Sequence, residues 1–282
     1  KKIPESNVVD FVKKYQNFFQ KNKISFFEMT VAMAFNYFSK SKVDIAIIET
    51  GLGGRLDATN IINPIISIIT NVGLDHQEFL GEDIKQIAEE KAGIIKSCKP
   101  VVISEYQSSI HKIFIDKANE KKSDIYLAND IDISDFSTDL QGSFQNKNIK
   151  GVIKSLSIID DLSISTKDIK KGLLNVINNT GLRGRWEIIN QRPRTILDVG
   201  HNFEAFEETI KAFDEISFEK LRIVIGFVKG KNFEKILRSL PKDAYYYFCQ
   251  PDINRALKVE EIFNYSKKTG MKGKSFLTVK SA

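Results

Sequence analysis

The sequence has very little cysteine, and its two cysteines exclude several classes of protein. Cys98 and Cys249 form no CxxC motif in a chain of 282 residues, so neither a disulfide framework nor a cysteine-rich metal site is indicated. No apolar run approaches the ~20 residues that cross a membrane, and the sequence does not open with a signal peptide. We therefore expect a cytoplasmic protein without a membrane partner.

A phosphate-binding loop is also missing. GMKGKS at 270–275 ends in the required GKS, but its first glycine lies two residues too close, and GFVKGK at 226–231 lacks the final serine or threonine. We interpret both as ordinary turns. The three histidines, His76, His111 and His201, are widely separated, so the sequence has no HxH pair of the kind that histidine-rich metal hydrolases use.

Lysine and arginine outnumber the acidic residues. The formal net charge of +6 at pH 7 mildly favours anionic ligands. The basic residues are spread along the chain, so no nucleic-acid partner is indicated. A hydrophobic content of 42% and a charged content of 28% are typical of a globular protein. The length allows one large domain or two ordinary ones.

Apolar runs alternate with amphipathic segments along the chain, which is typical of a parallel α/β architecture. The expected strands are 43–49, 65–71, 100–104, 194–199, 221–227 and 244–249. The expected helices are 26–40, 83–96, 148–159, 167–178, 203–216, 231–239 and 258–269. Ser25 and Glu28 form a capping-box pattern at the start of the first helix. The segment 122–147 has weak helical periodicity and is expected to cross between layers as irregular strands.

The most informative stretch is IIETGLGGRLDATN, residues 47–60. The expected strand before it ends in Glu49, and three glycines follow within the next five residues. Ligands bind just beyond the carboxyl ends of parallel strands, and glycine lets the backbone approach a ligand closely. A glycine-rich turn with a solvated carboxylate is the alternative, which the length and polar content of the string disfavour.

Five further motifs accompany this string. They are ITNVGLDHQEFLG (69–81), EEKAGIIK (89–96), LQGSFQNKN (140–148), GLRGRW (181–186) and LDVGHN (197–202). In this order, the six motifs resemble the folylpolyglutamate synthase/dihydrofolate synthase family, the folate branch of the Mur-type ligases. The resemblance implies a parallel-sheet ATPase domain at 1–183 and a smaller Rossmann-like glutamate-ligase domain at 184–282.

The family carries its phosphate loop in an amino-terminal portion that this sequence does not contain. We therefore expect a truncated chain whose ATPase domain is incomplete. The end at Ser281 and Ala282 also looks early for the family. Such a chain is expected to fold but to have little or no ligase activity by itself.

The resemblance implies ATP-dependent amide formation between L-glutamate and the carboxylate of a folate or dihydropteroate, through an acyl phosphate. Phosphoryl transfer of this kind uses ATP as co-substrate and Mg²⁺ to screen and align the phosphates. Glu49 and His76 match the family's metal ligands. Histidine is an unusual ligand for magnesium, and from the residues alone His76 would be an ordinary loop histidine.

Lys91 falls at helical spacing on the apolar face of the expected helix 83–96. A lone lysine in such a place usually snorkels or pairs with a carboxylate. The resemblance implies a catalytic lysine that is carbamylated and lies near the metal. Burial would favour this modification, because it lowers the pKa of the amine and leaves it neutral.

Asn148, Arg185 and Asp198 match the family's ATP-contacting positions. Arg183 is a weaker rival of Arg185, since either guanidinium could bind phosphate in bidentate fashion. His201 is expected near the reacting groups, as a second catalytic residue. Alternatively, the LDVGHN motif could simply cap the helix that follows it, because asparagine is a good N-cap.

The resemblance also implies a site for the pterin-bearing substrate. Its positions are Phe26, Phe27, Glu28, Leu56, Asp57 and Ala58. The two aromatic rings could pack on a flat ring of the substrate. An ordinary helix start with core phenylalanines is the alternative for either of them.

Three other functions compete with the folate ligase. One is a Mur ligase of peptidoglycan synthesis, which GLGGRLDATN and GLDHQEFLG disfavour. Another is a carbamyl-lysine metal hydrolase using Glu49, His76, Lys91 and His201, and the third is a non-catalytic nucleotide-binding remnant. The motifs do not separate dihydrofolate synthase from folylpolyglutamate synthase. We expect a monomer.

Overall fold

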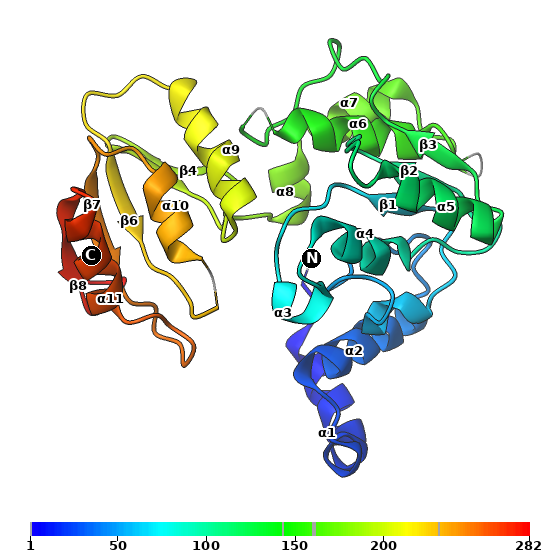
Figure 1. Ribbon diagram of the computed structural model, residues 1–282. Coiled ribbons are helices and arrows are strands. Elements are labelled where there is room, and N and C mark those ends of the chain that lie inside the picture. The colour runs from blue at the N-terminus through cyan, green and yellow to red at the C-terminus, as the bar shows by residue number, and fades with distance from the viewer. Residues whose placement is uncertain (1, 143, 160–161, 231) are drawn as a thin grey trace. The chain divides into compact units, whose positions relative to one another are not determined.

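In the computed structural model, the chain forms two compact units (Figure 1). The structure describes residues 2–142, 144–159, 162–230 and 232–282. Unit 1 comprises Lys1–Asp139 and Asn146–Leu182, and unit 2 comprises Leu140–Gln145 and Arg183–Ala282. No helix in these described ranges combines the length and the apolarity that a membrane crossing requires.

Unit 1 contains helices around a short parallel sheet. Its helices are α1 (Glu5–Asn22), α2 (Phe26–Ser41), the 3₁₀ turn η1 (Ala58–Ile61), α3 (Gln77–Leu80), α4 (Ile84–Ala92), α5 (His111–Lys121), α6 (Gln145–Leu156), α7 (Thr166–Leu173) and α8 (Val176–Thr180). Its strands are β1 (Ser67–Ile69), β2 (Val101–Ile103) and β3 (Ile125–Leu127), which pair in parallel in the order β1-β2-β3.

The core of unit 1 lies between this sheet and two helices. All three residues of β2 are at most 1% exposed, as are Ile87 and Ala88 of α4, and Phe114 of α5 is 2% exposed. Apart from Val102, these side chains belong to one apolar cluster with Ile69 of β1. The central strand is apolar along its whole length because side chains cover both of its faces.

The strand expected at 43–49 is not formed, and that prediction is wrong. The segment has no regular secondary structure, and no described strand pairs with it. Val43 is 42% exposed, Ile45 50% and Ile47 93%. A strand needs a neighbour for its backbone N–H and C=O groups. The apolar run alone therefore did not indicate whether a neighbouring strand is present.

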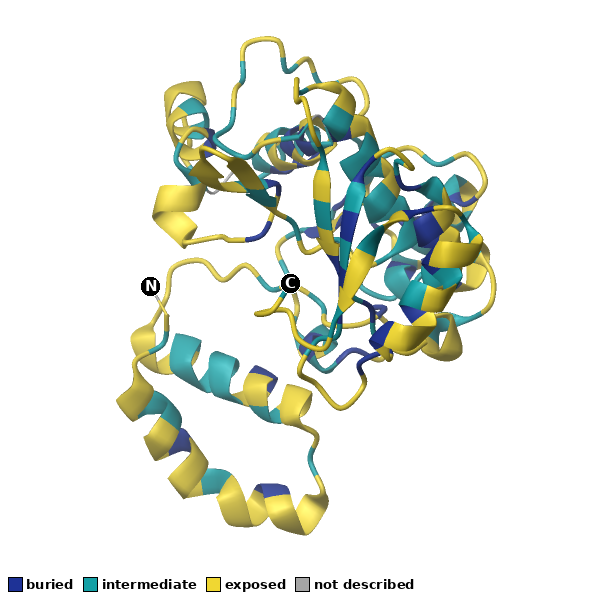
Figure 2. Ribbon diagram, turned by 90° about the vertical axis from the view of Figure 1, so that its left-hand side faces the viewer, coloured by how far each residue is buried: buried dark blue, intermediate teal, exposed yellow. Residues whose placement is uncertain are grey.

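Helix α1 was not expected from the sequence. Its apolar face is narrow: Phe11, Tyr15 and Phe19 follow at four-residue spacing, with neighbouring ring centroids 4.8 and 6.1 Å apart. Helices α1 and α2 contact each other, and Phe11 and Phe19 are almost fully buried. Figure 2 shows the exposed outer faces of these two helices, the first in the chain.

The helix expected at 167–178 is broken into α7 and α8. The Asp139 carboxylate accepts hydrogen bonds from the backbone N–H groups of Val176 (3.1 Å) and Ile177 (3.0 Å). These bonds satisfy donors that a helix start leaves without partners. A residue 37 positions away in sequence therefore starts α8, and local periodicity could not indicate it.

Unit 2 carries a second parallel sheet with helices packed against it. Its elements are β4 (Glu187–Gln191), β5 (Arg194–Leu197), α9 (Phe203–Asp214), β6 (Arg222–Ile225), α10 (Phe233–Ser239), β7 (Tyr245–Cys249), α11 (Val259–Lys268) and β8 (Lys272–Phe276). Strands β6, β7 and β8 pair in parallel in that order. Tyr246 and Phe248 of β7 are fully buried and stack with ring centroids 5.4 Å apart.

The strand expected at 194–199 forms, but in a different arrangement. It is β5, which pairs antiparallel with β4 in a hairpin of its own. Most residues of β5 are exposed, so it is not a strand of a buried parallel sheet. Strand β4 was missed because most of its residues are exposed as well, and no apolar run marks it.

Replacement of Phe248 by alanine tests the core of unit 2. We expect Phe248→Ala to lower the free energy of unfolding by about 3–5 kcal/mol, because it leaves a cavity in a closed core. The single tryptophan, Trp186, contacts Phe213 within unit 2, so its fluorescence during urea titration reports on this unit. Phe218→Ala is the control, since Phe218 is 46% exposed. Equal losses in the two variants would contradict this assignment of the core.

Candidate functional site

The glycine-rich string of unit 1 forms a loop around one carboxylate. Asp57 Oδ2 accepts hydrogen bonds from the backbone N–H groups of Gly51 and Leu52, both at 2.8 Å. Its Oδ1 accepts from the N–H of Thr59 at 2.9 Å and from the Thr59 hydroxyl at 2.5 Å. Burial raises the pKa of Asp57, but the hydrogen bonds from Thr59, Leu52 and Gly51 outweigh it, so the pKa lies below its ordinary value.

The loop lies directly against helix α4. A Cβ on Gly54 would come within 2.8 Å of the Glu90 carbonyl oxygen, and one on Gly93 within 2.4 Å of Arg55 Cα. Arg55 donates its backbone N–H to the Glu90 carbonyl at 2.8 Å, and its guanidinium donates to Glu90 Oε1 from Nε (3.1 Å) and Nη2 (2.8 Å). Glycine is required here for close packing, and the result is that Lys91 lies beside the loop.

Lys91 is partly buried on α4, as expected from its place on the apolar face. Burial lowers the pKa of its ammonium, and the nearby Asp75 carboxylate opposes part of that change. Asp75 was missed by the sequence analysis, although it directly precedes His76 in the GLDH motif. Its position after the strand expected at 65–71 was the sequence signal that could have identified Asp75 as a site residue.

His76 and Asp75 place a nitrogen and an oxygen close together. His76 Nε2 lies 3.9 Å from Asp75 Oδ2, and the His76 backbone N–H donates to Asp75 Oδ1 at 2.8 Å. Two ligand atoms of one Mg²⁺ ion, each about 2.1 Å from the metal, lie at most about 4.2 Å apart. The pair therefore fits a divalent cation, and the carboxylate supplies the hard oxygen that histidine lacks. Glu49 is exposed at the end of the segment 43–49, and its role as a ligand stays a prediction.

The start of α2 lies beside the glycine loop. The Ser25–Glu28 capping box is formed, with the Ser25 N–H donating to Glu28 Oε2 at 2.8 Å, and these bonds lower the pKa of Glu28. The ring of Phe27 occupies the place that a Cβ on Gly51 would take. Phe26 is 82% exposed and Leu56 79% exposed, so these apolar side chains are available to a ligand. Ala58 begins η1 and is half-buried.

In unit 2, the Asp198 carboxylate joins two turns. Its Oδ2 accepts from the Trp186 N–H at 2.8 Å and its Oδ1 from the Gly200 N–H at 2.7 Å. The Val199 N–H donates to the Gly184 carbonyl at 2.9 Å. Arg185 is exposed on the first of these turns, so it and Asp198 belong to one local structure. Their contact with a nucleotide stays a prediction.

The remaining expected site residues lie at the starts of two helices. Asn202 caps α9 by accepting from the Ala205 N–H at 2.9 Å, so the capping interpretation of LDVGHN is confirmed. His201 is exposed, and its Nδ1 lies 3.2 Å from the Val199 carbonyl oxygen. Asn148 is exposed in the first turn of α6. The functional roles of His201 and Asn148 stay predictions.

Two family models match the chain in order. The Mur ligase middle domain matches residues 6–190, and the Mur ligase, glutamate ligase domain matches residues 184–282. The dihydrofolate synthase/folylpolyglutamate synthase of Buchnera aphidicola (subsp. Schizaphis graminum) is 32% identical over 262 residues, 87% of this chain and 60% of that protein. The Escherichia coli (strain K12) protein of the same name is 30% identical over 279 residues, 92% of this chain and 63% of that protein. The chain thus spans about three fifths of the length of these curated relatives.

Solved structures resemble the chain along its whole course. A folylpolyglutamate synthase from Thermotoga maritima is 31% identical with a TM-score of 0.81, over 99% of this chain and 70% of that one. Escherichia coli FolC in complex with DHPP and ADP is 26% identical with a TM-score of 0.87, over 100% of this chain and 69% of that one.

Replacement of Asp57 by asparagine tests the loop. We expect Asp57→Asn to lower the free energy of unfolding by about 1–3 kcal/mol at pH 7, because an amide group cannot accept all four bonds. The folded pKa of Asp57 lies below its unfolded value of about 3.9. The stabilisation is therefore complete above that pH and is lost as the pH falls through the folded pKa.

The difference between wild type and Asp57→Asn should accordingly shrink in urea titrations below about pH 4. Asp116→Asn is the control, because Asp116 is exposed and forms an ion pair with Lys112 on the same helix, α5. A pH-independent difference between wild type and Asp57→Asn would contradict the role of the ionised carboxylate.

Proposed function

Because this chain belongs to the Mur ligase family, in the branch of folylpolyglutamate synthase and dihydrofolate synthase, we propose that it acts in ATP-dependent ligation of L-glutamate to a folate-type carboxylate. The expected fold, a parallel-sheet Mur-ligase-type domain followed by a smaller Rossmann-like α/β domain, is confirmed. The observation that carries the proposal is the Asp57-centred loop packed on α4, which sets Lys91 near Asp75 and His76.

The proposed reaction has two steps. The substrate carboxylate oxygen attacks the γ-phosphorus of ATP, which releases ADP and forms an acyl phosphate. The glutamate nitrogen then attacks the acyl carbon, so that a C–N bond forms, the C–O bond to phosphate breaks, and the amine gives up a proton. The ADP and DHPP named for the Escherichia coli FolC complex support a nucleotide and a folate precursor as ligands.

Four residues of unit 1 have proposed roles in this reaction. Glu49, His76 and Asp75 would hold a divalent cation, with Mg²⁺ as the expected ion, and the bound ion would screen phosphate charge. Lys91 would be carbamylated. Its burial lowers the pKa and thereby increases the neutral fraction of the amine, which is the form that takes up carbon dioxide.

The other expected residues divide between nucleotide and acceptor. Asn148, Arg185 and Asp198 would bind ATP, and His201 would lie near the reacting groups. The pterin-bearing substrate would contact Phe26, Phe27, Glu28, Leu56, Asp57 and Ala58. The exposed rings and the exposed Leu56 at the α2 start and loop support this surface. We further propose a monomer that acts in the cytoplasm.

Neither alternative enzyme is favoured. The curated relatives reported above carry folate-ligase names rather than names of peptidoglycan ligases. A carbamyl-lysine hydrolase would need several histidine ligands, and the chain contains three histidines in all. Amide hydrolysis without ATP would be the observation that favours a hydrolase.

Incorporation of labelled L-glutamate tests the proposed function. The assay supplies ATP, Mg²⁺ and either dihydropteroate or tetrahydrofolate, and it uses the chain alone and within any longer open reading frame that contains it. We expect ADP release and glutamate incorporation in equal amounts from the longest form. The absence of ATP-dependent incorporation on both acceptors would refute the proposal.

Replacement of Lys91 tests whether this residue acts as a carbamate or as a structural cation. Lys91→Arg keeps the positive charge but cannot form the carbamate, so we expect turnover to fall by at least about two orders of magnitude. Lys85→Arg, at an exposed position of the same helix, should keep normal turnover. Near-normal turnover in Lys91→Arg would make Lys91 a structural lysine.

Replacement of Glu49 tests the proposed metal site. Glu49→Gln removes one negative charge, so we expect turnover to fall by about two orders of magnitude, with partial recovery at high Mg²⁺. The exposed Glu89 of α4 provides the control variant Glu89→Gln. Wild-type turnover of Glu49→Gln at limiting Mg²⁺ would show that Glu49 is not a ligand.

A further inference from the structure

A side-chain amide joins two loops at the carboxyl edge of the sheet in unit 1. The Val72 N–H donates to Gln107 Oε1 at 2.8 Å, and Gln107 Nε2 donates to the Val72 carbonyl at 2.8 Å. Val72 is 3% exposed, so its backbone groups need partners within the protein. The amide has an acceptor and a donor side by side. Gln107 thus bonds to both backbone groups of one residue, as a hydrogen-bonded partner in an antiparallel strand does.

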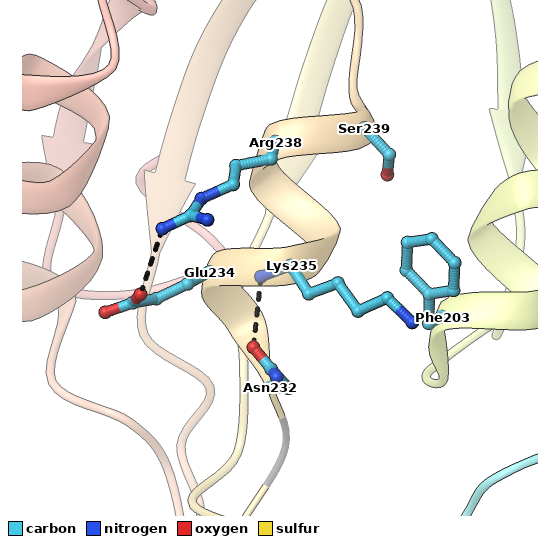
Figure 3. A pocket seen from close by; sticks show the side chains of 6 residues that line it. All are labelled: Phe203, Asn232, Glu234, Lys235, Arg238 and Ser239. Atoms are coloured by element: carbon cyan, nitrogen blue, oxygen red, sulfur yellow. Dashed lines mark hydrogen bonds and ion pairs between the residues drawn. The ribbon is translucent and has the colours of Figure 1, made fainter.

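This contact differs from the local caps that other amide side chains form. Asn232, at the start of α10, accepts from the Lys235 N–H at 3.0 Å, three positions away (Figure 3). Such a cap stabilises the end of its own helix. Gln107 and Val72 are 35 positions apart, so their contact fixes one loop relative to another.

The loop that carries Gln107 is itself anchored to two further elements. The Gln107 carbonyl accepts from the N–H groups of Ile110 (3.1 Å) and His111 (2.9 Å), at the start of α5. Ile110 is fully buried. The Tyr106 N–H donates to Asn129 Oδ1 at 3.2 Å, just beyond the end of β3. The backbone of Gln107 is therefore fixed by other parts of unit 1, and its amide offers a fixed partner.

The loop that contains Val72 leads directly to the proposed metal ligands. Residues 70–76 connect β1 to α3 without regular secondary structure. Asp75 and His76 follow Val72 by three and four positions. Ligands of a metal site need to be held within about 0.5 Å of their working positions, and hydrogen bonds around the ligands provide that precision. The two bonds to Val72 constrain the short stretch of backbone that carries both ligands.

We propose that Gln107 is a positioning residue of the metal site, which acts through Val72 on the loop that carries Asp75 and His76. The inference rests on the proposed function and deepens its metal site. Gln107 lies outside the six sequence motifs, between EEKAGIIK (89–96) and LQGSFQNKN (140–148). Its amide would raise the affinity for a divalent cation without binding the ion.

Binding of Mn²⁺ without ATP or a folate tests this role, with Mn²⁺ as a paramagnetic probe of the cation site. The chain is titrated with Mn²⁺, and electron paramagnetic resonance measures the free ion. Broadening of the His76 ring signals in NMR locates the bound ion, and the His76→Gly variant assigns those signals.

Replacement of Gln107 should weaken the binding of Mn²⁺. Gln107→Met keeps the length of the side chain but loses both bonds to Val72, so we expect the Kd to rise about tenfold or more. Gln107→Asn keeps the amide on a side chain that is one carbon shorter. It cannot reach both groups of Val72, so its Kd should rise as well.

Ser123→Ala is the matched control for a general loss of stability in unit 1. Ser123 is buried, and its hydroxyl donates to the Lys99 carbonyl. Both residues precede strands, at the amino-terminal edge of the same sheet. The control thus also loses a bond from a side chain to the backbone. Urea titration should show both Gln107→Met and Ser123→Ala to be folded and less stable, but the Kd of Ser123→Ala for Mn²⁺ should stay within about twofold.

Three results would overturn the proposal. They are no selective broadening of the His76 signals in wild type, an unchanged Kd in both Gln107 variants, and an equal rise in Ser123→Ala. The positioning role and the enzymatic function can fail separately. Mn²⁺ binding that depends on Gln107 without ligation of glutamate would refute the function alone, whereas ligation with wild-type dependence on Mg²⁺ in Gln107→Met would refute the positioning role alone.

Discussion

The site of unit 1 depends on one buried carboxylate, Asp57. Its oxygens accept four hydrogen bonds from residues within six positions of it, and these bonds close the glycine string into a fixed loop. A loop without regular structure has backbone donors that need partners once they leave water. The ionised Asp57 carboxylate supplies these partners. It thereby fixes the conformation of the loop surface that packs on α4. The resemblance also assigns Asp57 to the substrate site. Because four hydrogen bonds already engage its carboxylate, a substrate would have to contact the loop that Asp57 closes and not the carboxylate oxygens themselves.

In unit 2, a hydrogen-bonded aspartate also stabilises the loops of the expected site. Asp198 accepts from Trp186 and Gly200 and so joins the turn that carries Arg185 to the turn that leads into α9. Charge-assisted bonds of this kind are stronger than neutral ones, and they let exposed polar loops keep one conformation. In both units, residues identified by motif are thus partly structural, so loss of activity in a variant at either aspartate needs a matched measurement of folding.

Local patterns predicted much of the fold, and long-range contacts explain most of what they missed. The Ser25–Glu28 box and the Asn202 cap were correct because each depends on residues within three positions. The apolar run at 43–49 gave no information about a neighbouring strand, and the break between α7 and α8 depends on the distant Asp139. Asp75 was overlooked because its importance comes from the proximity of Lys91, which the fold alone brings to it. The expected proximity of Glu49 to Lys91 also depends on long-range contacts, and it stays a prediction.

The backbone at His76 restricts how its side chain can be studied. His76 has a φ of 51°, in the left-handed region, directly before α3. Alanine and β-branched residues are strained there, whereas asparagine and glycine adopt this conformation readily. A His76→Ala variant would therefore mix backbone strain with loss of the imidazole. His76→Gly keeps the loop relaxed and adds no ligand atom, whereas the side-chain oxygen of asparagine could itself bind a divalent cation, so glycine is the informative replacement at this position.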